Sequence, residues 1–253
     1  MSTDTKAATG LSLQRDTWLT GKFGRAVWRV AHDNDGEPLS ALRSPSPLFA
    51  YAKVDTADVA SLWSLNEHGF RVVDAALTLE GSTRVDARGN NVRFAVSGDL
   101  DAVGRIAGSS FRYSRFHIDP RIPLEMAHAL KAEWATNFFR GTRGDGMVVA
   151  ERDGRVVGFT LLMWHAADCL VIDLICVEPA YQGQGIGGAM IGHAWQHGTG
   201  DTRRPSRIRV GTQVANTPSI RLYESLGFRL VGSQYVLHLH SGHPLANDAH
   251  RRD

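Results

Sequence analysis

The sequence LICVEPAYQGQGIGGAMIGHA, residues 174–194, joins an apolar segment to a second apolar segment through a glycine-rich loop. Glycines in the loop have no side chain, so the backbone there can approach a ligand closely. A helix that begins after the loop would point unpaired N–H groups and a partial positive charge toward it. We therefore expect a strand–loop–helix unit that binds an anion such as a phosphate group.

Two well-known phosphate-binding loops, the dinucleotide-binding loop and the Walker loop, are possible interpretations of this segment. Gly183, Gly185 and Gly188 satisfy the G-x-G-x-x-G pattern of dinucleotide-binding folds, which is weak evidence by itself. A hairpin precedes the loop, and the following strand, SRIRVGT, ends without the acidic residue that would hold a ribose. The absence of Gly-Lys-Ser/Thr excludes a Walker loop. A glycine-rich helix start that only packs tightly is a less favoured alternative.

The residues from 91 onward predict a mixed α/β sheet. Residues 146–164 predict a hairpin that turns at Asp153-Gly154, and Asn216 is expected to cap a helix that contains Pro218. Strands are expected at 91–98, 169–177, 206–212 and 229–240, and helices at 99–108, 123–139, 185–198 and 216–228. Because strands and helices do not simply alternate, the sheet is expected to be mixed.

The first 90 residues predict a separate, smaller unit. A strand at 48–54, a helix at 56–68 and a strand at 70–80 are expected there. Residues 1–20 and the loops at 33–47 are expected to be irregular. The predicted domains are residues 1–88, residues 89–241 and a disordered tail, 242–253.

Part of this smaller unit resembles the C-terminal part of the chain. LNEHGFRVVDAALTLE (65–80) and LYESLGFRLVGSQYVLHL (222–239) share a helix end, Gly-Phe-Arg and a long strand. Gly69 and Gly227 lie 227 − 69 = 158 positions apart, and this offset places Tyr223 on Leu65. The N-terminal unit is therefore interpreted as a partial, degenerate copy that lacks both the glycine loop and the tyrosine.

Two linked motifs of the C-terminal part resemble those of the GNAT superfamily of acetyl-CoA-dependent N-acetyltransferases. One is Gln182-Gly-Gln-Gly185-Ile-Gly187 directly after a strand. The other lies on the next helix, where Asn216, Ser219, Leu222-Tyr223 and Gly227-Phe228 follow in order. The resemblance implies a GNAT fold with a mixed, splayed sheet, preceded by a partial, degenerate GNAT-like unit, and acetyl-CoA as the co-substrate.

The resemblance also implies roles for particular residues. Tyr223 would donate a proton to the departing thiolate and Asn216 would support it, although a tyrosine that only packs in the core is the alternative. The cofactor-binding set would be Ile175, Cys176, Val177, Gln182, Gly183, Gln184, Gly185, Ile186, Gly187, Gly188, Asn216 and Ser219. In this set the loop amides would hold the diphosphate, and the strand backbone would contact the pantetheine arm.

The acceptor is expected to be a small nucleotide-linked amino sugar. SSFRYSRFHIDP (109–120) and RVGTQVANTPSIRLYESLG (209–227) resemble GNAT enzymes that acetylate dTDP-4-amino-4,6-dideoxyhexoses. Arg115, His117 and Asp173 are the predicted acceptor-binding residues. The sequence does not single out a general base. Another small amine, a protein acceptor, or a non-catalytic acyl-CoA-binding regulator are the alternatives.

Composition narrows further the classes of protein to which the chain can belong. A formal net charge of +2 gives no basic field for nucleic acid, and two cysteines are too few for a disulfide framework. MSTDTKAATG at the N-terminus is polar, so we expect no signal peptide or membrane span and a cytoplasmic protein. His238, His240 and His243 favour an exposed strand end over a metal site, and no metal is predicted. An exposed strand edge is compatible with a homodimer.

Overall fold

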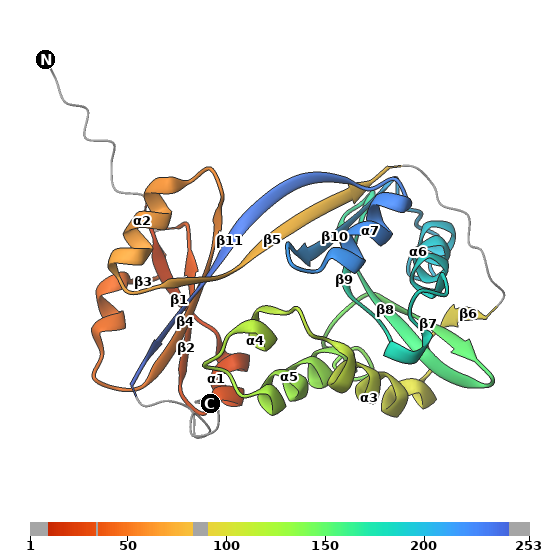
Figure 1. The fold of residues 1–253 in the computed structure, drawn as a ribbon, viewed down its shortest axis with the longest axis horizontal. Helices are drawn as coiled ribbons and strands as arrows, with labels where there is room; N and C mark the ends of the chain where they lie inside the picture. Colours follow the sequence, from red (N-terminus) through yellow and green to blue (C-terminus); the bar gives the residue numbers. More distant parts are fainter. Residues whose placement is uncertain (1–9, 34, 83–90, 243–253) are drawn as a thin grey trace, which may run out of the picture. The chain divides into compact units, whose positions relative to one another are not determined.

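The computed structural model describes residues 10–33, 35–82 and 91–242 (Figure 1). The chain forms two compact units, one of residues 76–232 and one that combines residues 1–75 with 233–253. Strands β5 (Arg71–Gly81) and β11 (Arg229–Ser241) each contain a boundary between the units. This division differs from the predicted boundary at 88/89, and the polar residues 83–90 lie outside the described ranges.

The larger unit is built on the mixed sheet that the sequence predicts. Its strands are β6 (Val92–Phe94), β7 (Gly146–Arg152), β8 (Arg155–Ala166), β9 (Cys169–Val177), β10 (Arg207–Gln213) and the second part of β5. They lie in the order β5-β10-β9-β8-β7-β6. Neighbouring strands in this order are antiparallel except β9 and β10, which are parallel.

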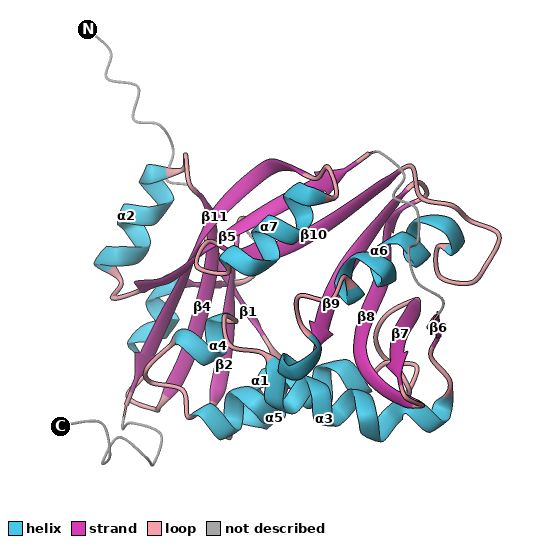
Figure 2. Cartoon of the chain, turned by 45° about the vertical axis from the view of Figure 1, so that its right-hand side comes forward, coloured by secondary structure: helices cyan, strands magenta, loops and turns pink. Residues whose placement is uncertain are grey.

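Helices cover both faces of this sheet. They are α3 (Leu100–Ser110), α4 (Arg115–Ile118), α5 (Leu124–Thr136), α6 (Ile186–His197) and α7 (Thr217–Ser225). Val148 and Ala150 pack with α6, whereas Met147 and Val149 pack with α3, because successive strand residues point to opposite faces. Figure 2 shows α3 and α5 on one side of β7–β9 and α6 on the other. The predicted helices and strands of this region are confirmed, and α4 is a further short helix in the segment 109–120, for which no element bounds were predicted.

The smaller unit contains more regular structure than predicted. Its elements are β1 (Ser12–Arg15), α1 (Thr17–Phe23), β2 (Ala26–Ala31), β3 (Glu37–Pro38), β4 (Leu48–Asp55), α2 (Val59–Glu67) and the remaining parts of β5 and β11. The expectation that residues 1–20 are irregular is wrong for β1 and α1. Asp16 accepts a hydrogen bond from the Leu19 amide at 2.9 Å and thereby caps α1, and Leu13 and Leu19 are buried.

The two similar sequence segments form corners with the same local geometry. Asp58 caps α2 and Asn216 caps α7, each by accepting the amide N–H three residues later. The glycine after each helix has a positive φ, +91° at Gly69 and +80° at Gly227. These agreements are compatible with the interpretation of a degenerate copy, which remains a prediction because such corners also arise independently.

The C-terminal histidines do not form the exposed strand end that was predicted. His238 is buried, with its ring edge-on to Phe49 at 4.8 Å between centroids. The His240 ring stacks on Phe49, and its Nδ1 lies 2.9 Å from an Arg25 nitrogen. Both side chains therefore belong to the packing of the smaller unit, and His243 lies outside the described residues.

Along the described ranges, no helix combines the length and the apolar character that crossing a bilayer requires.

Candidate functional site

The parallel strands β9 and β10 separate partway along their length. Their paired register ends at Ile172 and Val210, although β9 continues to Val177 beside β8, and β10 continues to Gln213 beside β5. The facing edges beyond this point leave the parallel ladder, so their backbone groups can bond to a ligand. The sheet is therefore splayed, as predicted.

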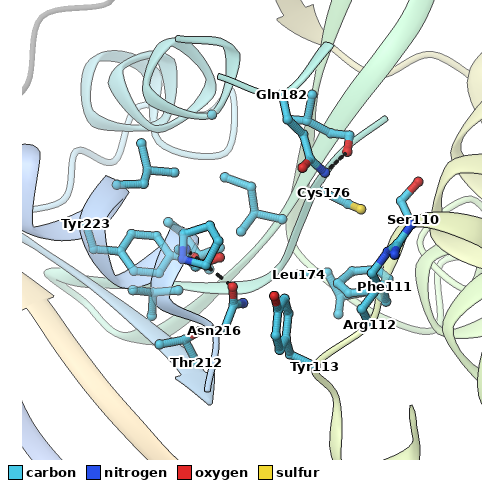
Figure 3. A pocket seen from close by; sticks show the side chains of 18 of the residues that line it. Ser110, Phe111, Arg112, Tyr113, Leu174, Cys176, Gln182, Thr212, Asn216 and Tyr223 are labelled. Atoms are coloured by element: carbon cyan, nitrogen blue, oxygen red, sulfur yellow. Dashed lines mark hydrogen bonds between the residues drawn. The ribbon is translucent and has the colours of Figure 1, made fainter. Parts of the chain in front are cut away.

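A cavity of about 800 Å³ opens at this splay. It is lined by residues 110–114, 172–177 and 210–213, by the glycine loop and by α7. In Figure 3, Asn216 and Tyr223 lie on one side of the cavity, and Ser110, Phe111 and Arg112 lie on the other. Of the predicted cofactor-binding residues, all but Gln184 and Gly188 border it.

The glycine loop has the local conformation of an anion site. Gly183 and Gly185 adopt φ of +75° and +77°, and a Cβ added at either would meet nothing within 4 Å. Gly185 is the N-cap of α6, whose first helical hydrogen bond runs from the Ala189 amide to the Gly185 carbonyl. The amides before Ala189 therefore have no partner within the helix. Gln182 Nε2 donates to the Val177 carbonyl at 2.9 Å and ties the loop to the end of β9.

The two predicted loop residues outside the cavity have other surroundings. Gln184 Nε2 lies 3.4 Å from the Ala180 carbonyl, within the loop itself. A Cβ on Gly188 would lie 3.7 Å from Leu226, which places Gly188 at the contact between α6 and α7. Gly188 therefore contributes to helix packing and does not border the cavity.

Tyr223 reaches the cavity from α7 and is otherwise enclosed. Its side chain is 2% exposed and packs beside Phe228. Burial raises the pKa of the Tyr223 phenol well above its ordinary range, and a hydrogen bond with Ser219 opposes this effect in part. The phenol is therefore protonated at physiological pH and able to donate a hydrogen bond into the cavity.

Only one of the three predicted acceptor-binding residues borders the cavity. Asp173 borders the cavity, but Arg115 and His117 lie on α4 and do not. The Arg115 guanidinium lies 4.5 Å from the Phe116 ring, and His117 Nδ1 lies 2.6 Å from the Ser114 hydroxyl. Burial lowers the pKa of His117 to about 4, so its ring is neutral at physiological pH. Neither side chain is placed to touch a ligand in this cavity.

Comparison with known proteins identifies the family of this site. The model of the acetyltransferase (GNAT) family matches residues 110–228, which include the glycine loop, Asn216 and Tyr223. The chain carries a GNAT acetyltransferase domain.

Two relatives and one solved structure describe the similarity further. The spore coat polysaccharide biosynthesis protein SpsD of Bacillus subtilis is 30% identical over 145 residues, which cover 57% of this chain and 49% of SpsD. The dTDP-fucosamine acetyltransferase of Escherichia coli O6:H1 is 25% identical over 241 residues, 90% of this chain and 97% of that enzyme. The chain thus spans about half the length of SpsD and nearly all of the second relative.

The fold of most of the chain also resembles that of a solved structure. The crystal structure of a GNAT-family acetyltransferase from Novosphingobium aromaticivorans superimposes with a TM-score of 0.54 at 18% identity. The superposition covers 85% of this chain and 84% of that one. At this identity the likeness concerns the fold alone.

Within the GNAT cavity, the Asp173 carboxylate already has three hydrogen bonds. Arg143 donates to both carboxylate oxygens at 2.7 Å, and the Trp134 indole donates to one of them at 3.0 Å. Asp173 is also the extra residue of a bulge, because Leu161 pairs with Leu174 and Leu162 with Ile172. Its carboxylate therefore holds Arg143 and Trp134 in place, which leaves it less suited to orient an acceptor amine.

Asp173→Asn is expected to destabilise the GNAT domain by about 1–3 kcal/mol, because it leaves a half-buried Arg143 without its charged partner. Urea unfolding followed by tryptophan fluorescence measures the change. Asp153→Asn is the matched control, since Asp153 is exposed in the β7–β8 turn at a positive φ that asparagine accepts readily. Equal midpoints for the two variants would contradict the structural role of Asp173.

Cys176 borders the cavity with a thiol that burial keeps protonated. The pKa of Cys176 is raised to about 12, because desolvation outweighs its hydrogen bond with Ser110. A thiol in this state is a poor nucleophile. Cys176 is therefore poorly suited to carry the acetyl group as a covalent intermediate. Cys169 and Cys176 are both buried and unpaired.

Sequence reasoning missed Lys131 of α5, which borders the cavity with only 9% of its surface exposed. A signal was present. Lys131 follows Ala127 by four positions and precedes Ala135 by four, so helical spacing places it on the buried face of α5.

Proposed function

We propose that this chain transfers an acetyl group from acetyl-CoA to the amine of a nucleotide-linked amino-deoxysugar of the dTDP-4-amino-4,6-dideoxyhexose type. The observation that carries the transferase part is the cavity at the splay of β9 and β10, bordered by the glycine loop and by Tyr223. The acceptor class rests on the similarity to dTDP-fucosamine acetyltransferase, which extends over 90% of the chain.

The residues of the cavity fit the chemical parts of acetyl-CoA. The amides at the start of α6 suit the diphosphate, because a helix N-terminus attracts negative charge. The edge of β9 at residues 173–177, free of the parallel ladder, suits the amide groups of the pantetheine arm. GNAT acetyltransferases use acetyl-CoA, which supplies the acetyl group as an activated thioester. Asn216 and Ser219 border the same cavity.

The remaining residues suit the transfer itself. The Tyr223 phenol is protonated and can stabilise the thiolate as the carbon–sulfur bond breaks. Phe111 and Tyr113 offer ring faces to a sugar or base, and Arg112 offers a guanidinium to a phosphate. Arg112, unlike Arg115, borders the cavity, so we assign the acceptor-binding role to Arg112 in place of Arg115.

The function is tested by incubating the protein with acetyl-CoA and a panel of TDP- and UDP-linked amino sugars. Mass spectrometry should show the gain of one acetyl group on dTDP-4-amino-4,6-dideoxygalactose, with release of free CoA thiol. Acetylation of other small amines or of peptides alone would reassign the acceptor. Acetyl-CoA binding without turnover on any amine would favour a regulator and contradict the proposal.

A further inference from the structure

Lys131 is a buried amine to which the proposed transfer reaction assigns no role. It lies on α5 and borders the same cavity as Tyr223. Its Nζ is 4.8 Å from the centre of the Phe111 ring and 4.9 Å from that of Trp134. A lysine is seldom buried without a reason, because removing its charge from water is costly.

The charged groups that face Lys131 do not provide it with a dedicated counter-ion. Asp173 on β9 attracts its positive charge, but the Asp173 carboxylate is already paired with Arg143. Arg115 on α4 and Arg143 both repel a further positive charge. The Cys176 thiol, also on β9, is protonated and contributes little. With burial as the largest cause, the pKa of Lys131 falls to about 8.

An acceptor amine cannot attack while it is an ammonium ion, because its lone pair is then held by a proton. A base in the cavity must take this proton, and a base works best when its pKa lies near the working pH. Lysines reach this range when they are buried. Asp173 and Cys176 also border the cavity, but one is occupied by hydrogen bonds and the other is a protonated thiol.

We propose that Lys131 is the general base that takes a proton from the ammonium group of the acceptor. This inference rests on the proposed function. The neutral Lys131 amine accepts the proton, and the freed lone pair forms the bond from nitrogen to the acetyl carbon. The carbon–sulfur bond breaks with its electron pair leaving on sulfur, which takes the Tyr223 proton. The new amide nitrogen returns its extra proton to Tyr223, and Lys131 releases its own to solvent.

The alternative is that Lys131 is protonated and anchors an anionic group of the acceptor. The two roles require opposite charge states, so substitutions separate them. Lys131→Arg keeps a positive charge but removes the base, since a guanidinium stays protonated. Lys131→Met removes both the positive charge and the base, and it keeps an apolar stem of similar length. Lys22→Met, at an exposed lysine of the smaller unit, is the matched control.

The test measures kcat against pH from 6 to 10 with acetyl-CoA and saturating dTDP-4-amino-4,6-dideoxygalactose. For the unsubstituted protein, kcat should rise with pH and level off above a pKa near 8. Lys131→Met and Lys131→Arg should each lose about a hundredfold at pH 7.5 and lose this inflection. Both should bind acetyl-CoA in calorimetry as the unsubstituted protein does, which shows that they fold.

Several outcomes would overturn the inference. Activity of Lys131→Arg within about tenfold of the unsubstituted protein would assign an anchoring role instead. An unchanged pH profile for Lys131→Met would remove Lys131 from the proton path while leaving the proposed function intact. Acetyl-CoA binding with no transfer by the unsubstituted protein would instead overturn the proposed function and the inference with it.

Discussion

Tyr223→Phe is expected to lower kcat by roughly 10²–10⁴ while leaving the affinity for acetyl-CoA nearly unchanged. The phenol is a protonated group that α7 brings to the cavity, and phenylalanine fills the same space without the hydroxyl. Loss of the hydrogen bond with Ser219 should cost only about 1 kcal/mol of stability. Steady-state kinetics with coupled thiol detection, together with calorimetry, measures the two effects separately.

The pH profile gives this prediction a second test. Because burial raises the pKa of Tyr223, deprotonation of the phenol requires a higher pH than for an exposed tyrosine. Activity should therefore not decline below pH 10 through loss of the Tyr223 proton. Tyr235→Phe, on β11 in the smaller unit, is the control and should be fully active. Turnover of Tyr223→Phe close to that of this control would show that Tyr223 only packs.

The sequence predicted most of the larger unit because its signals are local. Asn216 and Pro218 mark the start of α7, Asp153-Gly154 marks a hairpin turn, and the apolar run 169–177 is β9 to the residue. The side of the cavity formed by the glycine loop follows from the same signals, since a glycine loop between a strand and a helix fixes its own geometry. No tertiary information was required to place Gly183 and Gly185.

The N-terminal elements were missed because their stability comes from tertiary packing. β1 has only four residues and α1 only seven, and both are too short to show a clear hydrophobic period. Leu13 and Leu19 are nevertheless almost completely buried. Asp16 was a local signal, because an aspartate before a helix is a common N-cap, but it lies in a polar stretch that was expected to be irregular.

The acceptor side of the site could not be predicted residue by residue, since several segments distant in sequence form it. Arg112 and Arg115 are three positions apart, yet only Arg112 borders the cavity, because the chain enters α4 at Arg115. Asp173 borders the cavity, but its carboxylate is bound by Arg143, which lies thirty residues earlier in the chain. Which of these side chains faces a ligand depends on how α3, α4 and α5 pack on the sheet.

Gly185→Val is expected to weaken acetyl-CoA binding by up to about a hundredfold. Gly185 has a φ of +77°, where a β-branched residue is strained by roughly 1–3 kcal/mol. The loop can relieve this strain only by turning its amides away, so binding must restore the strained conformation, and each 1.4 kcal/mol changes Kd about tenfold. Calorimetry with acetyl-CoA measures the change.

Gly154→Val separates this effect from general destabilisation. Gly154 has a φ of +73° in the β7–β8 turn, and a Cβ at Gly154, as at Gly185, would meet nothing within 4 Å. The two variants should therefore lose similar stability, while only Gly185→Val loses affinity for acetyl-CoA. Acetyl-pantetheine, which lacks the diphosphate, should be used equally well by both variants. If Gly185→Val impaired the use of acetyl-pantetheine as strongly as that of acetyl-CoA, the start of α6 would not be the site that holds the diphosphate.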